Sequence, residues 1–228
     1  MKILVTESQY NKILREEEEK KILRVPGLDF FSEHEGKAWE ILQRILKQRG
    51  NPPYTIGGDL NLSDTPIKSL VNLISVEGSL NLRNTPIESL GNLTSVGGTL
   101  DLENTPIESL GNLSSVGLDL YLENTPIKSL GNLISVGKTF DLRGTPIESL
   151  GNLTSVGGHF NLEGALIKSL GNLKSVGGSL NLYVTPIKSL GNLKLVKRHL
   201  DLELTSLSKK YTEDQIRQMV NVGRDIFM

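Results

Sequence analysis

The stretch from Gly97 to Val116 reads GGTLDLENTPIESLGNLSSV, and close copies of it recur at a spacing of twenty residues. A fixed period of this length is typical of solenoids, in which each repeat forms one coil and contacts only its neighbours. Paired apolar residues mark one point of every coil: Leu60/Leu62, Leu80/Leu82, Leu100/Leu102, Leu120/Leu122, Phe140/Leu142, Phe160/Leu162, Leu180/Leu182 and Leu200/Leu202. Because side chains alternate along a strand, each pair lies on one face of a short strand. The sequence therefore predicts eight strands that stack as a parallel sheet.

The rest of the coil supplies further inward residues, exemplified by Ile107 and Val116. Only about nine residues separate these two positions, too few for a helix and its turns, so we expect extended or 3₁₀ backbone there. Some polar residues recur in nearly every coil. We expect them to form ladders that satisfy backbone groups at the corners. In the Gly97–Val116 copy they are Thr105, Ser109, Asn112 and Ser115.

Composition narrows the classes of function. The chain has 228 residues, a formal net charge of −1 and no cysteine. The charge gives no steer toward nucleic acid or an anionic membrane, and the absence of cysteine excludes disulfides and thiolate zinc sites. No segment approaches the ~18 apolar residues of a membrane-spanning helix, and the first residues carry too short an apolar run for a signal peptide. We therefore expect a soluble, cytoplasmic protein that does not contact a membrane.

The two ends of the chain depart from the repeat. Residues 6–24 are predicted to be helical, because Thr6 and Gln9 have capping-box spacing and a charged run follows from Arg15 to Lys21. A second helix is predicted over residues 32–49. Its apolar face, which would cover the first coil, consists of Ala38, Ile41, Leu42, Ile45 and Leu46.

The C-terminal end carries a second capping-box spacing, at Thr212 and Gln215, followed by a helical pattern with Ile216, Met219 and Val220. The last residues, 222–228, resemble the repeat again and predict a ninth strand with Ile226 and Met228 pointing inward. These patterns divide the chain into an N-terminal helical arm and cap (1–55), repeats (56–207) and a C-terminal helix with a capping strand (208–228).

The repeat, with its Leu-x-Leu-x-x-Thr-Pro-Ile core, resembles the leucine-rich repeat, whose general form is LxxLxLxxNxL. The short twenty-residue coil is similar to repeats of bacterial and tailed-phage proteins and to receptor L-domain coils, and Met1–Tyr10 is similar to the start of marine phage proteins. Thr105 and its equivalents stand where the family usually has a ladder Asn. The resemblance implies an α/β solenoid: a leucine-rich-repeat parallel β-sheet of about eight to nine coils with N- and C-terminal helical caps. It also implies ligand binding without catalysis, usually through the exposed face of the sheet.

Three exposed columns flank the inward pairs of the predicted sheet, and these positions vary between coils. They carry nine carboxylates and two arginines, so this face has a formal charge of about −7. Like charges stacked on one sheet are destabilising, which favours a binding surface for a basic protein partner. The candidate partner-binding residues are Asp101, Glu103, Asp119, Tyr121, Glu123, Asp141, Arg143, His159, Glu163 and Tyr183. The alternative is that these charges keep a flat sheet from associating with other sheets.

Signatures of catalysis, metal binding and cofactor binding are absent from the sequence. His159 and His199 share a column but lie two coils apart, ~10 Å, which is too far for one metal ion with ligand bonds of ~2 Å. We predict no catalytic residue, no metal site and no cofactor. The C-terminal lysines lack interleaved aromatic residues as stacking platforms, so nucleic-acid binding is not expected.

Two functions remain open. The first is a protein-recognition module that uses the sheet face, in a bacterial or phage-infected cell or on a virion. The second is a passive structural or virion-associated rod, in which the charged N-terminal arm makes the contacts. The oligomeric state is left open by the sequence.

Overall fold

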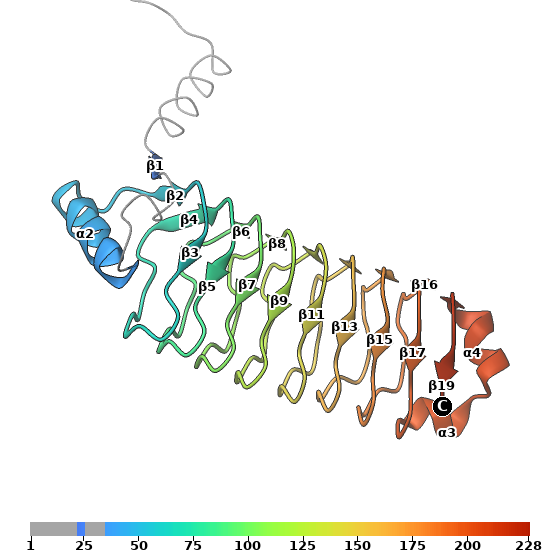
Figure 1. The fold of residues 1–228 in the computed structure, drawn as a ribbon. Helices are drawn as coiled ribbons and strands as arrows, with labels where there is room; N and C mark the ends of the chain where they lie inside the picture. Colours follow the sequence, from blue (N-terminus) through green and yellow to red (C-terminus); the bar gives the residue numbers. More distant parts are fainter. Residues whose placement is uncertain (1–21, 26–34) are drawn as a thin grey trace, which may run out of the picture.

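The structure is a computed structural model that describes residues 22–25 and 35–228, and for residues 35–38 it describes the backbone only. The repeats form an elongated stack of coils, with helix α2 at one end and helices α3 and α4 at the other (Figure 1). Most of the predicted helix at residues 6–24 lies outside the described residues. Its last part was predicted wrongly, because Leu23–Val25 forms strand β1, which pairs in parallel with Tyr54–Ile56.

Each coil carries one strand of a sheet that we call sheet B. The predicted parallel stacking is confirmed, and register pairs such as Leu100 with Leu120 follow the twenty-residue period. The predicted ninth strand is also confirmed, since β19 pairs with β17. In spatial order from the C-terminal end the strands are β19 (Ile226–Phe227), β17 (Leu200–Asp201), β15 (Leu180–Asn181), β13 (Phe160–Asn161), β11 (Phe140–Asp141), β9 (Leu120–Tyr121), β7 (Leu100–Asp101), β5 (Leu80–Asn81) and β3 (Leu60–Asn61).

A second parallel sheet, sheet A, runs along another side of the coils and was not predicted from the sequence. It arises because the Ser-Val dipeptide returns at the same point of each turn, so that backbone groups of successive coils meet in register, as Ser115 and Ser135 do. Its strands are β1 (Leu23–Val25), β2 (Tyr54–Ile56), β4 (Leu73–Val76), β6 (Ser95–Val96), β8 (Ser115–Val116), β10 (Ser135–Val136), β12 (Ser155–Val156), β14 (Ser175–Val176), β16 (Leu195–Val196) and β18 (Asn221–Val222).

The fold is therefore a parallel β-solenoid, and the expected α/β solenoid is a wrong class for the coils. Each regular coil carries two short strands joined by turns and extended segments, and the described helices lie outside the regular coils. About seven regular turns lie between Leu60 and Leu200, slightly fewer than the eight to nine expected. The regular coils, which all lie within the described residues, carry no helix because a coil of twenty residues leaves no room for one opposite sheet B.

The core is one continuous column of buried side chains that runs through the coils. Phe140 and Phe160 stack in it with ring centroids 5.0 Å apart. The inward-facing Leu, Ile and Val residues of the repeat are nearly all fully buried. Each regular coil repeats this pattern with its neighbours, so burial of apolar surface stabilises the stack one coil at a time.

Helix α2 (Glu35–Gln48) confirms the second predicted helix within the described residues, but its buried face is different. Trp39, Leu42 and Leu46 are buried, whereas Ile41 and Ile45 are 42% and 37% exposed. The contact with the first coil is therefore a narrower stripe than the predicted apolar face.

The C-terminal region confirms the second capping box, with Thr212 and Gln215 bonded reciprocally at the start of α4 (Glu213–Met219). A short helix that was not predicted, α3 (Ser206–Lys210), precedes it. Ile216 and Val220 are buried, but Met219 and Met228 are 45% and 37% exposed, so the expected inward direction of Met228 is wrong.

Candidate binding face on sheet B

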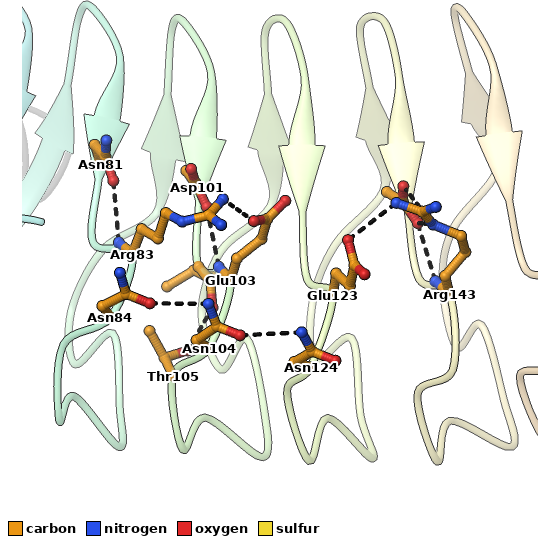
Figure 2. A network of polar contacts seen from close by, with 12 residues as sticks. Asn81, Arg83, Asn84, Asp101, Glu103, Asn104, Thr105, Glu123, Asn124 and Arg143 are labelled. Atoms are coloured by element: carbon orange, nitrogen blue, oxygen red, sulfur yellow. Dashed lines mark hydrogen bonds and ion pairs between the residues drawn. The ribbon is translucent and has the colours of Figure 1, made fainter.

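The outward face of sheet B holds the predicted partner-binding residues. At its centre, Asp101, Tyr121 and Asp141 occupy register-paired positions of strands β7, β9 and β11. Glu103, Glu123 and Arg143 follow these strands by two residues and form the next column. Figure 2 shows part of this region, with neighbouring coils bridged by side-chain contacts. His159, Glu163 and Tyr183 lie on coils nearer the C-terminal end, so the ten residues form a strip rather than one cluster.

The column that contains Asp101 has a structural role that the sequence analysis missed. Asp101 Oδ1 accepts a hydrogen bond of 3.0 Å from the backbone N–H of Glu103, two residues further on. This Asx turn satisfies a backbone donor where the strand ends. The same bond recurs at Asn61, Asn81, Asp141, Asn161, Asn181 and Asp201. The Asn and Asp residues of this column therefore shape the turn.

A second column joins successive coils. Asp119 Oδ1 accepts a hydrogen bond of 2.8 Å from the backbone N–H of Thr139, twenty residues later. At the equivalent position of a later coil, Nδ1 of His159 accepts from the N–H of Ser179 at 3.2 Å. The side chains of Asp59 and Ser79 make the same kind of bond. These residues thus also hold neighbouring coils together.

Both arginines of the face are paired with carboxylates. Arg83 Nη1 donates to Glu103, and Arg143 bridges Glu123 at 2.9 Å and Asp141 at 3.1 Å (Figure 2). Asp141, followed by Glu123, raises the pKa of Arg143. These exposed contacts are each worth ~0.2–1 kcal/mol. The predicted like-charge repulsion is therefore relieved at the centre of the face by the chain's own arginines.

Tyr121 departs from the Asx column. Among strands β3 to β17 of sheet B, it is the one residue in this column that is neither Asn nor Asp. Its ring is half-buried. Burial raises the pKa of its hydroxyl, and the negative charges of three neighbouring aspartates raise it further: Asp119, Asp101 and Asp141. Tyr121 is therefore a neutral aromatic group inside an acidic surround.

The recurring corner residues confirm the expected ladders in part. Asn112 Nδ2 donates to the carbonyl of Gly91 in the preceding coil at 3.4 Å, as expected. Thr105 and Ser109 act differently. Thr105 Oγ1 donates to the carbonyl of Leu102 at 2.7 Å, and Ser109 Oγ accepts from the N–H of Gly111 at 3.1 Å, both within one coil. A further side-chain ladder between coils is made by the residue that precedes the threonine. Asn104 Nδ2 donates to Asn84 at 2.8 Å, and Asn124 donates to Asn104 at 3.0 Å (Figure 2).

Asn104 and its equivalents adopt positive φ, near 57°, which Asn tolerates better than most residues. The repeated Glu-Asn-Thr and Arg-Asn-Thr triplets in the sequence were a signal for this ladder. The resemblance drew attention to the threonine instead.

A scan of family models, a search of curated proteins and a search of solved structures each gave no match. Within residues 22–25 and 35–228, no helix has the length and apolarity to cross a membrane. Over the same residues, the structure brings no three His, Asp or Glu side chains together as a metal-ion site.

Proposed function

We propose that this protein is a non-catalytic recognition module of the leucine-rich-repeat type, which binds a basic protein partner through the exposed face of sheet B. Tyr121 is the observation that carries the proposal. An Asn or Asp there would complete the Asx column that seven other coils use, so the aromatic side chain is not explained by the turn.

The surroundings of Tyr121 define the chemistry of the partner. A lysine or arginine over the ring would gain a cation–π contact of ~0.5–2 kcal/mol. Asp119 would pair with the same cation, since its Oδ1 is engaged by a backbone N–H alone and its charge is not met by an ion pair among the described residues. Glu103 and Glu123 already have arginine partners, so they position the arginines rather than attract new cations.

The terminal helices have a separate role in this proposal, which is to cover the two ends of the stack of coils. We propose that α2 caps the first coil through Trp39, Leu42 and Leu46, and that α4 caps the last through Ile216 and Val220, because these side chains are buried in the common core. We place the protein in the cytoplasm of a bacterial or phage-infected cell, or on a virion, on the strength of the sequence resemblance.

The test is a screen of a yeast-displayed random peptide library against the immobilised full chain, followed by affinity measurements on the selected peptides. We expect enrichment of peptides with Arg or Lys beside apolar residues, and binding that weakens as salt rises. Tyr121→Asn removes the aromatic group while restoring the Asx turn, so it should weaken binding at least about tenfold without loss of stability.

Ile134→Asn is the matched control, because Ile134 is 51% exposed and precedes a strand of sheet A. Selected peptides that bind Tyr121→Asn as tightly as the parent chain would place recognition elsewhere. Selection of acidic peptides alone would contradict the proposed partner.

A further inference from the structure

One corner of the coil changes its chemistry along the rod. The residue before the recurring threonine, which is replaced by Ala165 in one coil, has positive φ in each coil from Asp64 to Leu204. In the first four coils, amide and carboxylate side chains at this corner are joined by hydrogen bonds at 2.8, 2.8 and 3.0 Å. The next two coils have Gly144 and Gly164. The last two have Val184 and Leu204, which are 48% and 64% exposed.

The side chains of Val184 and Leu204 neither form hydrogen bonds at this corner nor favour its positive φ. A β-branched residue such as Val184 is disfavoured at positive φ, whereas Asn and Gly, found in the preceding coils, are not. Leu166, 47% exposed, follows the corner residue Gly164 by two positions and takes the place that Pro146 and Pro186 hold in neighbouring coils. We call Leu166, Val184 and Leu204 the apolar corner.

Three lysines lie close in sequence to the apolar corner and outnumber the nearby glutamates, Glu163 and Glu203. Lys188 follows Val184 by four residues, and Lys209 and Lys210 lie in α3, directly after the last corner. Of these three, none is in an ion pair within the described part of the chain. The chemistry that complements this surface is a short apolar stretch followed by carboxylates.

The chain's own N-terminal sequence has this chemistry. Residues 10–19 read YNKILREEEE, with Tyr10, Ile13 and Leu14 followed by four glutamates. They lie outside the described residues.

The apolar residues of this segment cannot all reach Val184 and Leu204 of their own molecule. Val184 lies between β14 and β16, which are seven and eight strand steps from β1, or ~34 to ~38 Å at ~4.8 Å each. The nine residues from Leu14 to Leu23 span at most ~32 Å when fully extended, whereas the thirteen from Tyr10 span up to ~47 Å. Simultaneous contact of Tyr10, Ile13 and Leu14 with Val184 and Leu204 therefore requires a second molecule.

We propose that the apolar corner binds residues 10–19 of a second copy of this chain, so that the rods associate head to tail. The contact is heterologous, because it joins different surfaces of the two copies, and each molecule retains one free surface of each kind. Such an assembly grows into linear chains as concentration rises. The proposal does not depend on the partner proposed for sheet B, because it does not use Tyr121, although Val184 directly follows Tyr183 of the candidate face.

The first test is sedimentation velocity of the full chain over a concentration series. The parent chain should show a mass that rises with concentration and falls with salt. Val184→Asn together with Leu204→Asn should weaken association at least about tenfold. Asn suits positive φ, so this variant should fold at least as well, which thermal unfolding checks. Ile134→Asn should assemble like the parent chain. A parent chain that remains monomeric at high micromolar concentration overturns the proposal.

The second test identifies the occupant by mixing two assembly-deficient chains. One carries the two Asn substitutions at the corner, and the other carries Ile13→Asn and Leu14→Asn. Each alone should be monomeric, and an equimolar mixture should form heterodimers and nothing longer, because only one intact pair of surfaces remains. If the second variant alone assembles like the parent chain, residues 10–19 are not the occupant and the proposal fails.

Discussion

At the scale of single residues, small polar side chains satisfy backbone N–H and carbonyl groups at the turns of each coil. The threonine that follows the ladder position is buried, and its hydroxyl donates to a carbonyl three residues earlier, as Thr105 does to Leu102. The Asx residue at the end of the sheet-B strand satisfies an N–H of the same turn, as Asp101 does. Turn formation thus depends on Thr105, which was expected to form a ladder between coils, and on Asp101, which was expected to be an exposed binding residue.

Thr105→Val tests the contribution of the buried hydroxyl. The substitution keeps the shape of the side chain but leaves the Leu102 carbonyl without this donor, so we expect a loss of ~1–2 kcal/mol in the free energy of unfolding. Urea unfolding measures it. Thr94→Val is the control, because Thr94 is exposed and its hydroxyl bond to Ile74 competes with water, so its loss should be below ~0.5 kcal/mol.

Asp101→Asn tests the pH dependence of stability. Burial raises the pKa of Asp101 in the folded chain, and Arg83 lowers it by a smaller amount. The folded state therefore holds this proton more tightly than the unfolded state, and stability falls as pH rises through the unfolded and then the folded pKa. Asn keeps the Oδ1 acceptor without the charge. The melting temperature should rise relative to the parent chain at pH 7, and the difference should shrink as pH is lowered below the unfolded pKa of ~3.9. A larger gain at low pH than at pH 7 would contradict this assignment.

At the scale of elements, glycine positions show two different constraints. Gly137 lies directly over Gly117 of the preceding coil, and a Cβ there would collide with the Gly117 carbonyl oxygen. Gly144 has φ of 63° and open space around its Cα, so backbone conformation alone constrains it. The close approach at Gly137 belongs to sheet A, whereas Gly144 belongs to the corner of the amide ladder.

Gly137→Ala should therefore lower the free energy of unfolding, whereas Gly144→Asn should not. The alanine forces two coils apart and should cost at least ~2 kcal/mol in the free energy of unfolding. The asparagine tolerates positive φ and lies next to Asn124 in the ladder, so it should leave stability unchanged or raise it by up to ~1 kcal/mol. Chemical denaturation of both variants decides this, with Gly144→Ala as a control for backbone strain without a new hydrogen bond.

At the scale of the whole molecule, the solenoid has the nearest-neighbour organisation expected of repeat proteins. Strand pairs join positions that differ by twenty residues through the regular coils, as from Leu100 to Leu120 and from Leu120 to Phe140. Removing one full period therefore leaves every remaining strand with an equivalent neighbour.

Deletion of residues 117–136 tests this organisation. The shortened chain should fold cooperatively with the same circular dichroism signature and a somewhat lower melting temperature, because it loses one interface between coils. Deletion of residues 117–135, one residue fewer, shifts all inward side chains after the cut by one position and should prevent cooperative folding. If both deletions behave alike, register along the rod is not what stabilises the stack.

The sequence by itself determined the coil, the strands of sheet B, their register and most of the core. It did so because a strict period of twenty residues places equivalent residues opposite one another, and because Leu-x-Leu alternation assigns their faces. It also identified the capping box of α4, which depends on residues three positions apart.

The tertiary structure decided what depends on which atoms of neighbouring coils meet. The pairing of Ser115 with Ser135 made a second sheet from two-residue segments too short to be recognised in the chain. The positions of Arg83 and Arg143 turned an apparently acidic face into one that is partly paired. The angle at which α2 meets the first coil left Ile41 and Ile45 exposed, because helical periodicity defines an apolar face but only packing selects the part of it that is buried.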